Sequence, residues 1–150
     1  MVANFTDILN KPADSIEKPK PLPVGTYLCV INGPHKQREI NDKPVIDITY
    51  KTVQAQPDVD AEALAASGGV GKFLTQTFFL TNNDGQVNDY PILAWMENAL
   101  GIEKTGKSLA QMLSEIPGKQ ALVTVKHNIF VSKTTGEPDV AANVGGVAKV

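Results

Sequence analysis

Hydrophobic and polar positions alternate along much of this chain in the way that half-buried β-strands require. Within residues 44–54, apolar side chains take one side and polar side chains the other: Ile46, Ile48 and Tyr50 against Asp47, Thr49 and Lys51. Strand-like runs also cover residues 24–32, 72–80, 119–127 and 138–149. The pattern therefore predicts five short strands.

A different spacing separates the third predicted strand from the fourth. Over residues 88–116, apolar side chains recur every three or four positions, which predicts helix. Gly101 ends a first helical segment, and Ser108 is placed to cap a second, shorter one. Five strands with a helix between strands 3 and 4 is the order of an oligonucleotide/oligosaccharide-binding (OB) barrel. The fold class predicted is mainly β, a five-stranded OB-fold barrel with a helical insertion between strands 3 and 4.

Prolines divide the chain into a head and a body. Pro12, Pro19, Pro21 and Pro23 prevent a continuous helix, so residues 1–23 are expected to form an extended N-terminal arm. Residues 24–150 form the predicted OB-fold domain, which fits the size of one ordinary globular domain. The arm is a candidate for self-association with another protomer.

Two absences bear on location. No stretch approaches the roughly 18–20 apolar residues that a membrane span needs, and the first residues lack the basic start and apolar core of a signal peptide. We therefore expect a cytoplasmic protein without a membrane partner.

The third predicted strand carries an aromatic surface. Phe73, Thr75, Thr77 and Phe79 share one side of it, next to Lys72. Two flat rings beside a cation suit sequence-tolerant stacking of single-stranded bases. The alternative is that both rings fill the barrel or lie beneath the helix. Further stacking candidates are Tyr50, then Tyr27 and Trp95, although a tryptophan at such a helical position more often anchors the helix to the core.

Charge qualifies this interpretation. The net charge is −2, whereas binding to a nucleic-acid backbone is driven by cations. Basic side chains are nevertheless present locally, in the polar segment 35–43 expected to connect strands 1 and 2 and on nearby strands, although Glu39, Asp42 and Asp47 reduce them to a small surplus. The phosphate-binding candidates are Lys36, Arg38, Lys43, Lys51, Lys72 and Lys126.

Catalytic and metal-binding patterns are weak. Residues 68–72 (GGVGK) partly match a phosphate-binding loop, but Ala66 and Phe73 stand where that motif needs glycine and Ser or Thr. The chain has two histidines and one cysteine, with no pair at ligand spacing. Cys29 lies in an apolar strand and is expected to act as a small buried hydrophobe. We expect no enzyme activity, no cofactor, no metal and no small-molecule substrate.

Four segments carry a resemblance to a known family. They are residues 4–11 (NFTDILNK), 18–27 (KPKPLPVGTY), 107–109 (KSL) and 142–144 (ANV). With them the chain resembles small bacteriophage proteins of the single-stranded-DNA-binding type. The resemblance implies a protein that binds single-stranded DNA without sequence preference and protects it during phage replication and recombination, in the cytoplasm of the host cell.

The rival hypothesis is a phage structural or assembly protein. In that case the same OB-like barrel would present its edges to other protein subunits, with the proline-bearing arm across a neighbour. The acidic net charge and the 6% aromatic content favour it.

Overall fold

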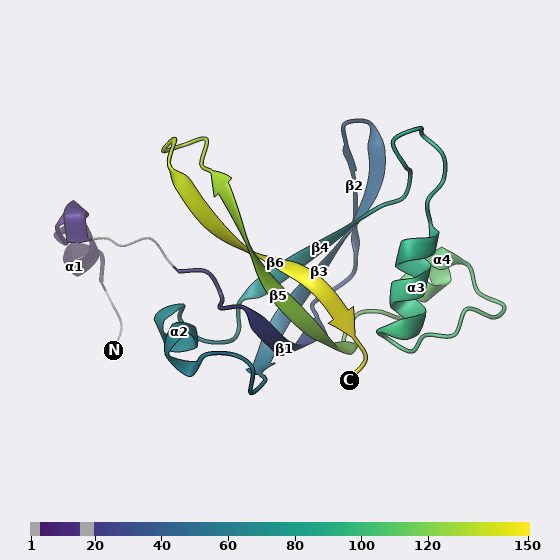
Figure 1. Cartoon of the computed structure of the whole chain (residues 1–150), viewed down its shortest axis with the longest axis horizontal. Coiled ribbons are helices and arrows are strands. Elements are labelled where there is room, and N and C mark those ends of the chain that lie inside the picture. The colour runs from purple at the N-terminus through teal and green to yellow at the C-terminus, as the bar shows by residue number, and fades with distance from the viewer. Residues whose placement is uncertain (1–3, 16–19) are drawn as a thin grey trace.

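Six antiparallel strands form one curved sheet, accompanied by short helices (Figure 1). This computed structural model describes residues 4–15 and 20–150. The elements are α1 (Phe5–Leu9), a 3-10 turn at Ala13–Ser15, β1 (Gly25–Ile31), β2 (Lys36–Ile40), β3 (Lys43–Ala55), α2 (Ala61–Ala66), β4 (Phe73–Phe79), α3 (Tyr90–Asn98), α4 (Leu109–Leu113), β5 (Gln120–Val131) and β6 (Pro138–Ala148). In the described part of the chain, no helix combines the length and apolar character needed to cross a membrane.

The long strand β3 organises the sheet. It spans 13 residues, and along one edge its first half pairs with β2 while its second half pairs with β1. Its other edge pairs with β4, and β1 continues the sheet through β5 to β6. The strands β4 and β6 contact each other, yet no hydrogen-bonded ladder between them is present among the described residues. The sheet is therefore curved but open.

The mainly β class and the helices between the third and fourth predicted strands are confirmed. The closed five-stranded barrel is not found in the described residues. The prediction that residues 35–43 form a loop is wrong, because most of this segment forms strand β2 and the tight turn into β3. Asn41 and Asp42 take positive φ angles of 50° and 65°, which suits a two-residue hairpin turn. Strand β2 lies at the edge of the sheet, where long charged side chains are common, and its sequence therefore lacks the apolar alternation that would have predicted a strand.

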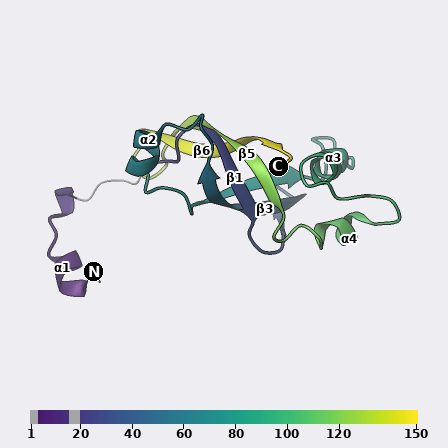
Figure 2. The ribbon, with the colours of Figure 1, turned by 90° about the horizontal axis from the view of Figure 1, so that it is seen from below.

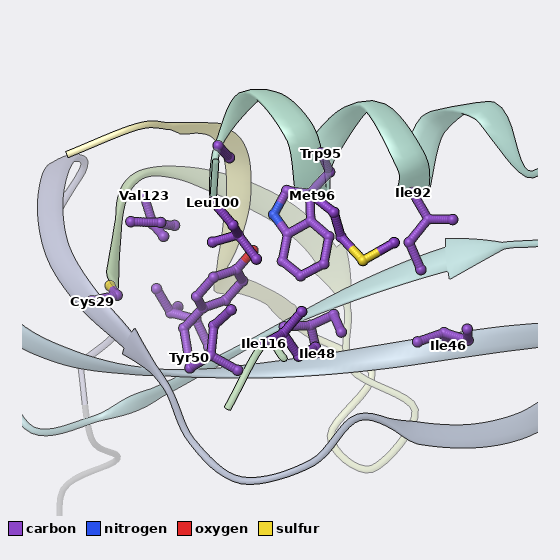
Figure 3. Packing of buried hydrophobic residues seen from close by; sticks show 14 of the residues in the cluster. Cys29, Ile46, Ile48, Tyr50, Ile92, Trp95, Met96, Leu100, Ile116 and Val123 are labelled. Atoms are coloured by element: carbon purple, nitrogen blue, oxygen red, sulfur yellow. The ribbon is translucent and has the colours of Figure 1, made fainter. Parts of the chain in front are cut away.

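Helix α3 covers the inner face of the sheet. Its Ile92, Trp95 and Met96 are buried and lie over Ile48 and Tyr50 of β3 (Figure 3). The Trp95 and Phe78 rings are 5.2 Å apart between centroids and inclined at 44°, a favourable aromatic arrangement. The expectation that Trp95 anchors the helix in the core is confirmed.

The segment before β1 is attached to the sheet. Leu22 and Pro23 are buried, a ring nitrogen of His127 (Nε2) lies 2.6 Å from the Leu22 carbonyl oxygen, and the Tyr27 hydroxyl donates to the Pro23 carbonyl at 2.8 Å. Helix α1 lies apart from the sheet in both views, on the opposite side from α3 (Figures 1 and 2). Of the predicted arm, residues 1–3 and 16–19 fall outside the described residues.

Cys29 occupies the middle of β1 and has no solvent exposure. Its burial raises the pKa of the thiol to about 12. The prediction of a small buried hydrophobe is confirmed.

Candidate nucleic-acid interface

Strand pairing brings one set of side chains together on the solvent side of the sheet. Because Ile46, Ile48 and Tyr50 of β3 point into the core, the alternating residues of β3 and their paired neighbours on β2 and β4 point outward. We call this surface the outer face. Its members are Lys36, Arg38, Ile40, Lys43, Asp47, Thr49, Lys51, Phe73, Thr75, Thr77 and Phe79, together with Val45, which shares this side of β3 but is buried.

Two phenylalanine rings stand at opposite ends of β4 on the outer face. Phe73 is 58% exposed and Phe79 is 43% exposed, so neither ring fills the barrel. Thr75 and Thr77 lie between them, and these small side chains protrude less from the sheet than the two rings do. Six positions of extended strand separate the two rings by roughly 20 Å. This distance leaves room for several nucleotides between two stacking points.

Basic side chains outnumber acidic ones across the outer face. Among the members of the outer face, Lys36, Arg38, Lys43 and Lys51 are the cations and Asp47 is the one carboxylate, while the exposed Glu39 of β2 points to the other side of the strand. Lys51 is exposed and lies directly opposite Phe73, so a cation adjoins a stacking ring. The overall charge of −2 is therefore not the charge of this surface.

The last two predicted cations lie beside the outer face rather than within it. Lys72 immediately precedes Phe73, and its Nζ is 3.4 Å from the Lys20 carbonyl oxygen. Lys126 lies on β5. The register of β3 with β1 and of β1 with β5 places its side chain on the same side of the sheet as Lys51. Its alkyl chain crosses Gly145 so closely that a Cβ there would come within 2.5 Å of Cγ. Gly145 thus leaves space for the Lys126 side chain on the sheet.

Phe130 is a candidate that sequence reasoning missed. It lies four positions after Lys126 on the same side of β5, in the hairpin that rises opposite the β2–β3 hairpin (Figure 1). Its ring is 41% exposed. The available signal was the apolar triplet 129–131 beside a polar turn, since a solvent-surrounded hairpin has little core for such residues to fill.

The predicted stacking roles of Tyr50, Tyr27 and Trp95 are wrong. Both tyrosines have no exposure, and Trp95 is only 7% exposed. Tyr50 and Tyr27 alternate with outward residues on their strands and therefore point into the core, where the Tyr50 hydroxyl donates to Oε1 of Gln76 at 2.5 Å. Burial raises the pKa of Tyr50 above its usual range.

Asp47 holds part of the outer face in place. Arg38 donates to it from Nε and, at 3.3 Å, from Nη2, while the Thr77 hydroxyl donates to its Oδ1 at 2.6 Å. The hydrogen bond from Arg38 is the main cause that lowers the pKa of Asp47. The carboxylate therefore stays ionised at neutral pH and neutralises Arg38.

Replacing Asp47 with asparagine is expected to strengthen binding to single-stranded DNA. The amide oxygen can still accept from Thr77, but the negative charge is lost and Arg38 becomes available to a phosphate. We expect roughly fivefold tighter binding at about 50 mM salt, and a salt dependence steeper by about 0.7 in log K against log salt. Fluorescence anisotropy measures both quantities. Glu103→Gln, in the exposed connection between α3 and α4, is the matched control, and equal affinities of Asp47→Asn and wild type would remove Arg38 from the binding residues.

Other chemistries find little support in the described residues. Within residues 4–15 and 20–150, no group of three or more His, Cys, Asp or Glu side chains is arranged to hold a metal ion. The GGVGK segment leads into strand β4 rather than into a helix, so it lacks the helix N-terminus of a phosphate-binding loop.

Comparisons with known proteins add no family to this picture. No protein-family model matches the chain, and no curated protein matches it either. The outer face and its surroundings are therefore the basis for a function.

Proposed function

We propose that this protein binds single-stranded DNA without sequence preference and protects it while it is exposed during phage replication and recombination. The observation that carries the proposal is the outer face, where two exposed phenylalanine rings lie among four cations and one carboxylate. Rings stack on unpaired bases of any sequence, and cations follow the phosphates. Bases in a duplex are already stacked on each other, so this chemistry favours single strands.

The arrangement of strands supports a partly open OB-type barrel. The order β4-β3-β1-β5-β6, with helices between β4 and β5, matches the five-strand order once β2 is taken as an elaboration of the first connection. In such barrels, ligands bind on the face of the second and third strands and to the loops after the first and fourth. The corresponding elements here are β3, β4, the β2 hairpin and the β5–β6 hairpin, and these carry the exposed phenylalanines and most of the candidate cations.

The direct test is anisotropy of fluorescein-labelled oligo(dT) titrated with the protein, with a hairpin duplex of the same length as competitor. Intrinsic fluorescence is unsuited because Trp95 lies in the core. We expect binding that the duplex competes for poorly. Equal binding to oligo(dT) and to the duplex would contradict a single-strand function. The rival function, a structural or assembly protein, predicts no binding to oligo(dT) at low or raised salt.

Binding is expected to depend on salt in proportion to the cations in contact. Three phosphate contacts, from Lys36, Lys43 and Lys51, imply a slope of about −2.1 in log K against log salt for single strands, or roughly 20-fold weaker binding from about 50 to 200 mM. Lys51→Ala should reduce the slope by about 0.7. Lys104→Ala is the control, because Lys104 faces Glu97 of α3 at 3.5 Å and lies off the outer face. A slope unchanged by Lys51→Ala would exclude that lysine from phosphate binding.

One observation favours the rival, a phage structural or assembly protein. Helix α1 exposes three apolar side chains, those of Phe5, Ile8 and Leu9, and such side chains gathered on one short helix suit contact with another protein. Self-association through the arm fits both functions. The oligonucleotide titration distinguishes them.

A further inference from the structure

A pocket opens at the hairpin end of the outer face. It has a volume of about 420 Å³ and is lined by Ile40, Asn41, Lys43, Phe79, Thr81, Asn82 and Asn83. Ligand pockets commonly measure about 300–1,000 Å³. The β2–β3 hairpin supplies one wall and the loop after β4 supplies the other; the two rise side by side in Figure 1 and are joined by a hydrogen bond from Lys43 Nζ to Asn83 Oδ1 at 2.8 Å.

Each wall offers a different group to a ligand. The Phe79 ring provides a flat apolar surface that is partly open to solvent. Lys43 is half-buried, and its ammonium group keeps further N–H donors besides the one that Asn83 accepts. Asp42 lies in the adjacent turn but is not among the lining residues. The pocket thus combines an aromatic platform with a fixed cation.

The two asparagine side chains present amino groups in a fixed orientation. Asn82 Oδ1 accepts from the backbone N–H groups of Asp84 and Gln86, each at 3.0 Å, and Asn83 Oδ1 accepts from Lys43. Exchanging Oδ1 and Nδ2 of either amide would place its NH₂ group against another donor. These hydrogen bonds therefore assign the oxygen and the nitrogen of each side chain. Neither Nδ2 group has a partner among the described residues, and both are available to carbonyl oxygens.

We propose that this pocket holds one nucleobase of the bound strand. The base stacks on Phe79, its carbonyl oxygens accept from Asn82 and Asn83, and the adjoining phosphate lies at Lys43. Thymine offers two carbonyl oxygens and adenine offers none, so the pocket favours thymine over adenine at this one position. The inference rests on the proposed function and adds a fixed register to a strand that is otherwise bound without regard to sequence.

The test replaces thymidines one at a time in the shortest oligo(dT) that binds with full affinity. Anisotropy is measured with an abasic nucleotide, and then with adenine, at each position. We expect one position where the abasic change weakens binding about tenfold and adenine weakens it about threefold. In Asn83→Ala that adenine penalty should shrink, because one of the two donors is lost, whereas Asn88→Ala, an exposed residue of the same loop outside the pocket, should retain it in full. A photoreactive 5-iododeoxyuridine at the sensitive position should crosslink to Phe79.

The outcomes separate this inference from the function beneath it. Normal oligo(dT) affinity with a uniform positional profile would overturn the pocket and leave single-strand binding intact. A sensitive position that Asn83→Ala does not alter would also overturn it. Failure of every oligonucleotide to bind would overturn both proposals. Thymidine monophosphate binding more tightly than oligo(dT) would reassign the pocket to a free nucleotide and contradict the strand-bound base.

Discussion

Replacing Phe79 with alanine is expected to weaken oligo(dT) binding by one to two orders of magnitude. The ring is 43% exposed on the outer face and forms a wall of the pocket beside Lys43. Removing an aromatic platform costs about 1–3 kcal/mol per stacked base, which corresponds to that range of affinity. Because the side chain is outside the core, thermal unfolding should stay close to that of the wild type. Anisotropy and differential scanning calorimetry measure the two effects.

Two variants at the same position separate stacking from general apolar contact. Phe79→Tyr keeps a flat ring and should retain most of the affinity, whereas Phe79→Leu keeps apolar bulk without the ring and should resemble alanine. Unchanged affinity in a folded Phe79→Ala protein would exclude this ring from the binding site. Equal affinities of the leucine and tyrosine variants would indicate burial of apolar surface rather than stacking.

The Tyr50→Ala substitution is expected to have its large effect on stability. Tyr50 has no exposure, its hydroxyl donates to Gln76, and its ring points toward Trp95 and Leu100 in the core (Figure 3). Truncating a buried aromatic side chain costs about 3–5 kcal/mol of unfolding free energy, because transfer and cavity contributions add. For a domain of this size the melting temperature should fall by about 6–20 °C. Calorimetry or thermal circular dichroism gives the shift.

Tyr50→Phe is the graded control for this prediction. It keeps the ring and removes only the hydroxyl, so the loss should be about 1 kcal/mol, that of one partly buried hydrogen bond. Both variants, measured below their melting temperatures, should bind oligo(dT) like the wild type. A Tyr50→Ala protein with an unchanged melting temperature and lost DNA binding would place this residue at the ligand instead.

The alternation of residues 46–51 predicted correctly which side chains share a face of β3. It also contained the answer for Tyr50, since a tyrosine that alternates in phase with Ile46 and Ile48 belongs to the core. Chemical type had suggested a stacking role, but strand parity decides orientation. On β4 both faces carry phenylalanine, so the pattern left two possibilities open, and only the packing of α3 over Phe78 distinguishes the inner side from the outer.

Strand β2 and the pocket were beyond the reach of the sequence for different reasons. Long polar side chains on β2 gave no apolar alternation, and the Asn41–Asp42 turn was the remaining signal of a hairpin. The pocket joins residues 40–43 to residues 79–83, which are distant in the chain and meet because β4 pairs with β3. Such a site depends on the register in which β4 pairs with β3, and this register cannot be predicted from the composition of the two segments.

The buried Cys29 gives this molecule a practical advantage for kinetic work. Its thiol is shielded and remains protonated at neutral pH, so maleimide dyes should leave the folded protein untouched. A single cysteine introduced at Lys133, in the turn after β5, would then be the one labelled position. A dye there can follow hairpin movement in stopped-flow mixing without first removing the native sulfur.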